Sequence, residues 1–306
     1  MTGLQPAFRA ALTGAALCCP AYAEVAAITS QNAGALTLVD TGTLAVLATV
    51  PLPGKPAAVA ADGARGRILA VAVETKRLHV FDLTGRLLAD WPLAGAPFGV
   101  AVREATGAAL VTDWTGILRE VDPATGAELH RWQVGATPSG VASGEGVLVT
   151  ADRDADSISI IRGDKVTAIA VGHHPFGVTL HEGRAFVTDV LSDQVSVIDL
   201  ATGATVATIP TGERPYATAF SAGRGFVTNQ YAASLTVFDA ATLHVIGQIE
   251  TDEYPEGIAT APDGRLFVAN WFSDTVQVID PAGLRVIETL DMPEGPRAFG
   301  NFIAVQ

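Results

Sequence analysis

The chain has 306 residues and a formal net charge of −13, from 19 Lys and Arg against 32 Asp and Glu. Hydrophobic residues make up 49% of the chain and charged residues 17%, which excludes an intrinsically disordered protein. The acidic balance argues against a general binder of duplex DNA, because such domains are usually basic. A chain of this length can form one domain with a large core, since all-β domains often exceed about 200 residues.

Residues 1–23 have the features of a cleavable export signal. Arg9 supplies a weakly positive start, residues 10–19 form a short apolar run, and Ala21-Tyr22-Ala23 is a small-x-small cleavage pattern. We therefore expect cleavage after Ala23 and a periplasmic or secreted protein, with a buried helix at residues 1–23 as the alternative. No later apolar run reaches the roughly 18 residues of a membrane-spanning helix, so no membrane span is expected.

The two cysteines, Cys18 and Cys19, both lie inside this predicted signal. The mature chain would then contain no cysteine. This excludes disulfides, thiolate metal sites, iron–sulfur clusters and cysteine nucleophiles from the expected exported form.

A repeat of about 40 residues runs through the rest of the chain, and proline marks it. Successive markers are separated by 41, 41, 37, 40, 40 and 41 residues. They are Pro56, Pro97, Pro138, Pro175, Pro215, Pro255 and Pro296. Two other features recur with the same period: a Val-Thr pair or a close variant, and an aspartate further along. Together with the prolines, three independent features support one repeat.

Each unit is predicted to contain four short strands, which we name A to D in chain order within the unit. Apolar residues alternate with polar ones, as in Val195–Ile198, which is typical of strands. Turn sequences separate the strands. In Asp122–Gly126 and Asp199–Gly203, the aspartate can accept hydrogen bonds from backbone amides and the glycine can adopt the left-handed conformation. Four-stranded units at this period predict a β-propeller.

The strand count predicts seven blades. The B, C and D strands occur seven times, beginning at residues 25–30, 35–40 and 46–51, whereas the A strand occurs six times internally. The seventh A strand is expected in residues 297–303, after the last marker proline. The fold class is therefore an all-β, seven-bladed propeller over residues 24–306, closed by a C-terminal strand that joins the N-terminal blade.

Several motifs resemble the YVTN β-propeller repeat. They are Phe226–Asn229, Phe186–Asp189 and Phe267–Asn270, followed by Val197–Asp199 and Val278–Asp280. Over residues 24–306 the chain resembles periplasmic propellers of the YncE type, which implies the same fold and an exported protein. The matching residues are blade scaffold, so the resemblance does not carry an activity with it. The fourth unit departs most, because no Asn or Asp directly follows Val149-Thr150.

The loops between strands D and A and between strands B and C emerge on one face, where large and charged residues collect. Function usually lies on such loops. We expect a binding site there, at the mouth of the central channel, formed by Lys55, His174, Arg214, Tyr254, Glu256, Arg297, Trp114, Tyr231 and Trp271. The B–C loops also contribute Gln31, Asn32, Asp152, Arg153, Asp154, Asp189, Asn229, Asn270 and Phe272.

Cations beside aromatic rings would suit an anionic or flat ligand, through charge-assisted hydrogen bonds and stacking. The alternative is structural. Glutamates stand in the same loops and can pair with the cations, while the aromatic rings can pack between blades. These glutamates are Glu213, Glu253, Glu256 and Glu294.

No metal or cofactor is predicted. His173 and His174 are adjacent and point to opposite sides of an extended chain, so they cannot chelate one ion as a pair. The stretch Asp152–Asp156 has part of the acidic spacing of a calcium loop but lacks its glycine and its final glutamate. No nucleophile elbow, zinc-protease motif or phosphate-binding glycine loop is present.

We predict a monomeric binding or scaffold module that presents the loop face to a partner protein or a small anionic ligand. The alternative is a periplasmic enzyme or redox accessory protein, with chemistry at His174, Arg214 and Glu256; some propellers that this chain resembles are lactonases, lyases or cofactor-bearing reductases. Single-stranded nucleic acid is a third candidate. Titratable groups converging in a deep pocket would favour an enzyme, whereas a flat surface with exposed aromatic rings would favour a partner protein.

Overall fold

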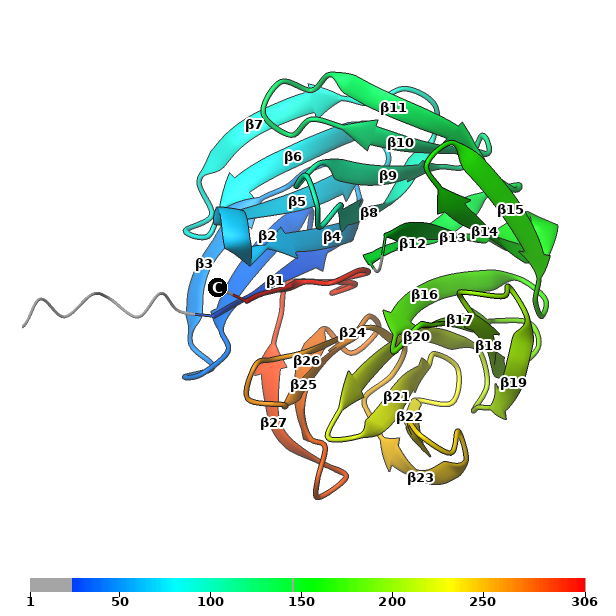
Figure 1. The fold of residues 1–306 in the computed structure, drawn as a ribbon. Helices are drawn as coiled ribbons and strands as arrows, with labels where there is room; N and C mark the ends of the chain where they lie inside the picture. Colours follow the sequence, from blue (N-terminus) through cyan, green and yellow to red (C-terminus); the bar gives the residue numbers. More distant parts are fainter. Residues whose placement is uncertain (1–23, 145, 306) are drawn as a thin grey trace, which may run out of the picture.

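The computed structural model describes residues 24–144 and 146–305, so the predicted export signal at residues 1–23 lies outside the described residues. Seven four-stranded antiparallel sheets are arranged around a central axis (Figure 1). The predicted seven-bladed propeller is confirmed. Blade 1 has the strand order β28-β1-β2-β3, and blades 2 to 7 follow in chain order from β4 to β27.

The innermost strands are the predicted A strands. They are β4 (Pro56–Asp62), β8 (Pro97–Val102), β12 (Pro138–Gly144), β16 (Pro175–His181), β20 (Pro215–Ser221), β24 (Pro255–Thr260) and β28 (Ile303–Ala304). The B strands are β1 (Val25–Ser30), β5 (Arg67–Ala72), β9 (Ala109–Asp113), β13 (Val147–Asp152), β17 (Arg184–Asp189), β21 (Arg224–Asn229) and β25 (Leu266–Asn270).

The C strands are β2 (Ala35–Asp40), β6 (Arg77–Asp82), β10 (Ile117–Val121), β14 (Ser157–Arg162), β18 (Gln194–Asp199), β22 (Ser234–Asp239) and β26 (Thr275–Asp280). The outermost D strands are β3 (Val46–Pro51), β7 (Leu87–Pro92), β11 (Glu128–Gln133), β15 (Lys165–Ala170), β19 (Thr205–Pro210), β23 (Val245–Glu250) and β27 (Arg285–Asp291). Two short 3-10 turns, η1 (Gly63–Arg65) and η2 (Arg153–Ala155), complete the described elements.

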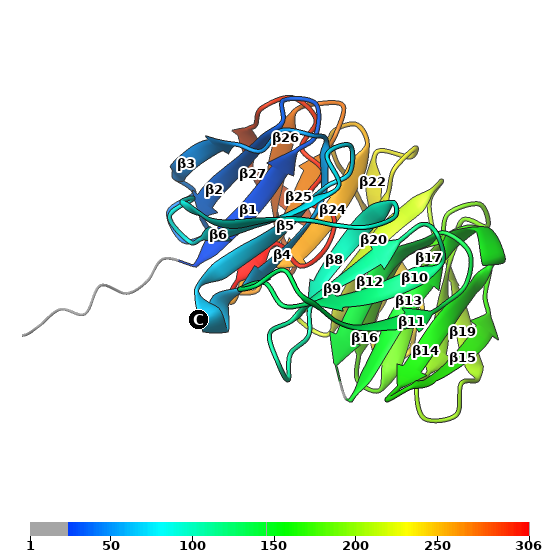
Figure 2. The ribbon, with the colours of Figure 1, turned by 90° about the horizontal axis from the view of Figure 1, so that it is seen from above.

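The two ends of the described chain meet in blade 1. Strand β28 pairs with the start of β1, and the amide of Ala27 donates to the carbonyl of Phe302 at 2.8 Å. Further along, the amide of Arg297 donates to the carbonyl of Thr29 at 2.8 Å. The C-terminal end lies beside η1 (Figure 2). This confirms the predicted closure, which leaves blade 1 with four strands like the others.

The threonine of the recurring Val-Thr pair links neighbouring blades through hydrogen bonds. The Thr188 hydroxyl accepts a hydrogen bond from the Gly177 amide at 2.9 Å and donates one to the carbonyl of Tyr216, in the next blade, at 2.9 Å. Thr112 and Thr228 make the equivalent pairs of bonds. A Cβ atom at Gly177 would collide with the carbonyl oxygen of Tyr216, so glycine permits the close approach of two innermost strands.

Blade 4 keeps the buried carboxylate of the repeat at the same place in the strand ladder, although the sequence spacing that leads to it differs by one residue. In the strand ladder Asp152 stands opposite the marker proline, as Asp189 does in blade 5. Both side chains are fully buried. Asp152 comes two residues after Thr150, whereas Asp189 comes one residue after Thr188. Matching Val149-Thr150 to Val187-Thr188 by sequence is therefore wrong by one residue in the structure.

The aspartate that recurs at the end of the C strand, in every blade except blade 4, where Arg162 stands instead, organises the C–D turn. In blade 2, Asp82 Oδ1 accepts hydrogen bonds from the amides of Thr84 at 2.9 Å and Arg86 at 3.0 Å. Burial alone would raise the pKa of Asp82, but hydrogen bonds from Thr84 and Arg86 outweigh it and lower the pKa to about 2. The predicted turn role of these aspartates therefore agrees with the hydrogen bonds.

We expect Asp82→Ala to lower the free energy of unfolding by about 1 kcal/mol at pH 7, because the turn amides lose an ionised acceptor. The pKa of Asp82 is lower in the folded state, so its contribution is present above pH 4 and is lost as the pH falls toward 2. Urea unfolding at pH 7 and pH 3 measures this. The control is Asp164→Ala, whose side chain is 91% exposed. An equal effect of Asp82→Ala at both pH values would contradict the assignment.

Candidate functional site

We call the side of the ring that carries the D–A and B–C loops the upper face, and the side that carries the A–B and C–D turns the lower face. On the upper face, the residue before the marker proline repeatedly adopts a left-handed backbone conformation. Its φ is 58° at Lys55, 58° at His174, 59° at Arg214 and 59° at Tyr254. This conformation is uncommon for residues other than glycine. Four of the nine predicted site residues therefore occupy one equivalent position in four D–A loops.

Carboxylates of the B–C loops hold this conformation. Asp156 Oδ1 accepts the amide hydrogen of His174 at 2.8 Å, and Asp193 Oδ1 accepts that of Arg214 at 2.9 Å. Lys55 is held differently, because its ammonium group donates to Asn32 Oδ1 at 3.2 Å. The loops are thus built to fix the residue before the proline, and part of the acidic character of this face serves that purpose.

The residues directly after the marker prolines fill the centre of the ring. We call Phe98, Phe176, Tyr216, Glu256 and Arg297 the plug. The rings of Phe98 and Phe176 lie 5.6 Å apart, and those of Phe176 and Tyr216 lie 4.4 Å apart. The Arg297 guanidinium lies 5.5 Å from the Phe98 ring and hydrogen-bonds to the Tyr216 hydroxyl.

A buried ion pair completes the plug. Arg297 Nε lies 2.9 Å from Glu256 Oε2, and Gln230 donates to Glu256 Oε1 at 2.6 Å. Burial raises the pKa of Glu256, although Arg297 opposes this. Burial alone would lower the pKa of Arg297, but the Glu256 carboxylate and Tyr216 outweigh it and raise the pKa. From the sequence we expect Glu256 and Arg297 at an open channel mouth. Here Glu256 is buried, the Arg297 side chain is only 16% exposed, and the two pair with each other, as the structural alternative expects.

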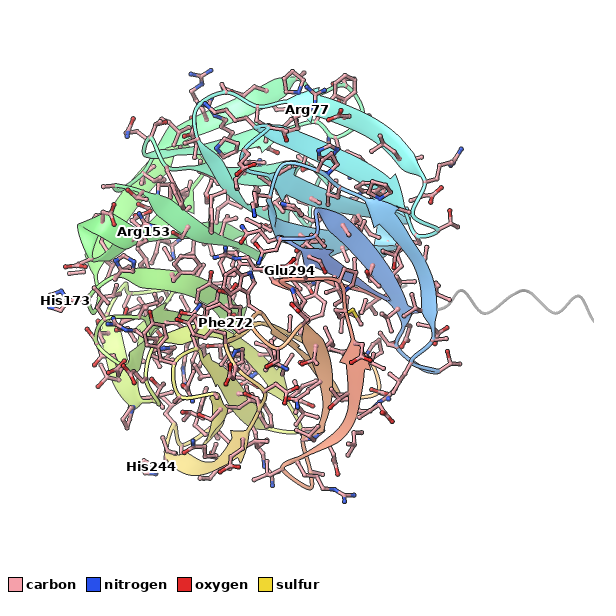
Figure 3. All side chains as sticks on the ribbon, turned by 180° about the vertical axis from the view of Figure 1, so that it is seen from behind. Arg77, Arg153, His173, His244, Phe272 and Glu294 are labelled. Carbon is pink, nitrogen blue, oxygen red and sulfur yellow. The ribbon has the colours of Figure 1, made fainter. Side chains whose placement is uncertain are left out.

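Exposed aromatic side chains surround Tyr254 on blades 6 and 7. We call Tyr231, Tyr254, Trp271 and Phe272 the aromatic cluster. The Tyr254 ring lies 5.2 Å from Tyr231, 6.2 Å from Trp271 and 4.1 Å from Phe272. Tyr231 is 53% exposed and Phe272 is 55% exposed. Phe272 and Glu294 lie close to the axis, whereas His173 and His244 lie at the outer edge (Figure 3).

Interactions within the aromatic cluster affect Tyr254. Burial and a hydrogen bond with Tyr231 raise the pKa of Tyr254 to about 12, so its hydroxyl is neutral at physiological pH. The Arg214 guanidinium lies 5.5 Å from the centre of the Tyr231 ring. Three predicted residues, Arg214, Tyr231 and Tyr254, are thus brought together with Trp271.

A second group lies on blades 3 to 5. The Arg153 guanidinium lies 4.7 Å from the centre of the Trp114 ring, and Trp114 stacks on Phe98 of the plug at 4.8 Å. Trp114 is 38% exposed. Burial lowers the pKa of His174, and the positive charge of Arg153 adds to this effect. Arg153 was named only as a loop residue in the sequence analysis, yet its position over Trp114 makes it a central cation of this group.

Three glutamates of the D–A loops border the aromatic cluster. Glu213, Glu253 and Glu294 stand two residues before successive marker prolines and are exposed. Among the described residues, none of the three has a Lys, Arg or His partner within 4.0 Å. The blade 6 and 7 side of the upper face therefore combines aromatic rings and three glutamates with Arg214, whereas Arg153 lies over Trp114.

Several B–C residues are scaffold rather than surface. Asp152, Asp189, Asn229 and Asn270 end their B strands and are fully buried. Asp189 Oδ2, for example, accepts the Ser196 hydroxyl hydrogen at 2.6 Å. In residues 24–144 and 146–305, no group of three His, Cys, Asp or Glu side chains is placed to hold a metal ion. Nor does that part of the chain contain a helix long and apolar enough to cross a membrane.

Comparisons with known proteins support the fold. No protein-family model matches the chain, and no curated protein matches its sequence. A functionally unknown protein from Desulfotomaculum acetoxidans superimposes with a TM-score of 0.75 at 12% identity, over 90% of this chain and 99% of that one.

Two enzymes are also structurally similar. Streptogramin B lyase has a TM-score of 0.70 at 12% identity, covering 78% of this chain and 84% of its own. Kuenenia stuttgartiensis hydrazine synthase has a TM-score of 0.71 at 16% identity, covering 84% of this chain and 92% of its own. At such identities the likeness extends to the fold alone. The protein is thus a seven-bladed β-propeller whose structural neighbours include enzymes and a protein of unknown function.

Proposed function

We propose that this propeller is an exported binding module of the YVTN type, whose upper face binds a partner protein. The observation that carries the proposal is the aromatic cluster, with Tyr231 and Phe272 more than half exposed beside the partly buried Tyr254. Exposed aromatic groups of this kind mark interaction sites more often than scattered apolar residues do. Tyrosine, tryptophan and arginine are also the residues that contribute most to binding energy at interfaces.

The absence of a convergent set of reactive groups also favours binding. Glu256 is buried and paired with Arg297, so it is not presented to a substrate beside His174 and Arg214. The plug fills the centre of the upper face. An enzyme or redox accessory protein is the alternative, because fold neighbours include a lyase and a synthase.

The charges around the aromatic cluster favour a partner with basic side chains. Glu213, Glu253 and Glu294 would repel a phosphate or carboxylate at this position, and the net charge of −13 would slow the approach of an anion. A small anionic ligand or single-stranded nucleic acid would find only Arg214 beside these three glutamates, or Arg153 beside Trp114. We therefore propose a protein partner that contributes Lys or Arg beside apolar side chains.

The test uses the mature protein as bait in periplasmic extract of its own host. We expect a partner that is retained by the wild type and is depleted about tenfold or more by Tyr231→Ala and by Phe272→Ala, because exposed aromatic anchors contribute strongly to affinity. The matched control is Leu47→Ala on the outer strand β3, which is 48% exposed and removes a similar apolar group. Captured proteins that are equally abundant with all four baits would exclude the aromatic cluster as the binding surface.

A further inference from the structure

The lower face contains a cavity that the predicted site does not include. Its volume is about 650 Å³, and it lies along the axis between the innermost strands of the blades. Phe299 lines it, and the Phe299 ring packs against Phe98, Phe176 and Tyr216 of the plug at 5.9, 5.1 and 5.5 Å. The cavity is therefore closed toward the upper face and opens on the lower face.

A ring of small residues makes this space. Four residues after each marker proline stand Ala60, Ala101, Ala142, Thr179, Ala219, Ala259 and Gly300, and all seven line the cavity. Because all seven residues are small, they take up little of the space between the innermost strands. The volume lies within the roughly 300–1,000 Å³ of small-molecule sites.

Apolar side chains form much of the inner wall, beside polar residues such as Ser143, Thr218 and Asn301. Between the small residues stand Val100, Val141, Val178, Ile258 and Ile303. Two of the wall threonines offer little to a ligand, because the Thr179 hydroxyl donates to the carbonyl of Thr218 at 2.8 Å and the Thr260 hydroxyl donates to the carbonyl of Phe220 at 2.9 Å. The third, Thr218, has a buried hydroxyl without a hydrogen-bond partner among the described residues. A molecule in the inner part of the cavity would gain mainly from removal of apolar surface from water.

The charged groups at the mouth of the cavity disfavour an anion. The Arg65 guanidinium lines it but pairs with Asp62 at 3.2 Å, and Glu104 adds an exposed carboxylate. His181 stacks on Phe220 with ring centres 3.9 Å apart and planes 8° apart. The mouth thus combines a flat aromatic pair with a charge balance that disfavours an anion.

We propose that this cavity binds a compact, neutral and predominantly apolar molecule, which enters from the lower face and lies between the small-residue ring and the His181–Phe220 pair. The proposal does not depend on the partner protein of the upper face. The two sites lie on opposite sides of the plug, so each can be tested in the absence of the other.

The test compares two fluorescent probes that share an aromatic frame. N-phenyl-1-naphthylamine is neutral, and 8-anilinonaphthalene-1-sulfonate carries an added sulfonate. We expect saturable fluorescence enhancement with the neutral probe at one site per chain. We expect at least about tenfold weaker binding of the sulfonate, because this charged group would lose its water beside the exposed Glu104 carboxylate. No enhancement with the neutral probe, or tighter binding of the sulfonate, would overturn the proposal.

Two variants locate the probe. Ala142→Phe and Ala101→Leu place larger side chains in the cavity from blades 4 and 3, and each is expected to weaken binding of the neutral probe about tenfold or more. Two variants in different blades are used so that a folding defect in one, seen by circular dichroism, leaves the other to decide. Tyr231→Ala, on the upper face, is the matched control and should bind the probe as the wild type does. Unchanged binding in a folded cavity variant, or loss of binding in the control, would place the probe elsewhere.

Discussion

Removal of residues 297–306 is expected to abolish the soluble monomeric fold. The deleted segment contains Phe299, Phe302 and Ile303, which are 5%, 0% and 1% exposed. Loss of two buried phenylalanines and an isoleucine would cost about 10 kcal/mol, which is comparable with the whole stability of a typical domain. The deletion would also expose the edge of β1, an entirely buried strand and thus a site for aggregation.

Size-exclusion chromatography and far-ultraviolet circular dichroism measure the outcome. The control is a chain that ends at Ala304, because Val305 is 53% exposed and is not part of β28. We expect the control to remain monomeric and the longer deletion to aggregate or unfold. A monomeric, soluble deletion variant with unchanged melting would show that blade 1 does not need its innermost strand.

Arg297→Met is expected to lower the free energy of unfolding by about 3–5 kcal/mol, because it leaves the carboxyl group of Glu256 buried without its counter-charge. Burial raises the pKa of Glu256 already in the wild type, and loss of Arg297 would raise it further. A carboxyl group with a raised pKa in the folded state binds more protons there, so its folded state loses stability as the pH rises. The free energy of unfolding of the variant should therefore be further below that of the wild type at pH 8 than at pH 5.

A double variant separates the ion pair from packing. Arg297→Met with Glu256→Leu removes both charges, and we expect it to recover much of the lost stability, since replacing a buried ion pair by apolar groups is often neutral. Urea unfolding of the two single variants, the double variant and the wild type gives the interaction energy. If the two single effects simply add, Arg297 and Glu256 do not stabilise the plug as a pair.

The repeat explains why most of the fold could be predicted. Marker prolines, alternating strands and turn aspartates recur with one period, so each unit supports the assignment of the others. The position of the seventh A strand followed from counting. Blade 4 shows the limit of this reasoning, because Asp152 keeps its structural place although its sequence spacing differs by one residue.

The upper face was harder to predict than the blades. The conformation of the residues before the prolines brings Arg214 and Tyr254 to the surface, but nothing in the sequence distinguishes an outward side chain from one that fills the axis. Tyr254 directly precedes a marker proline, whereas Glu256 and Arg297 directly follow one. Both positions hold charged and aromatic residues, so residue type alone does not tell them apart. The cavity of the lower face did leave a signal, because small residues recur four positions after the prolines. This signal is uninformative until the inner strands are placed around one axis.

The plug closes the central channel of the propeller and separates its upper face from its lower face. Phe98, Phe176 and Tyr216 close the centre together with the ion pair of Glu256 and Arg297. Nothing can pass from one side to the other along the axis unless these five side chains rearrange. A molecule bound on one side of the plug would therefore not touch one bound on the other side, so the two proposed sites could be occupied at the same time.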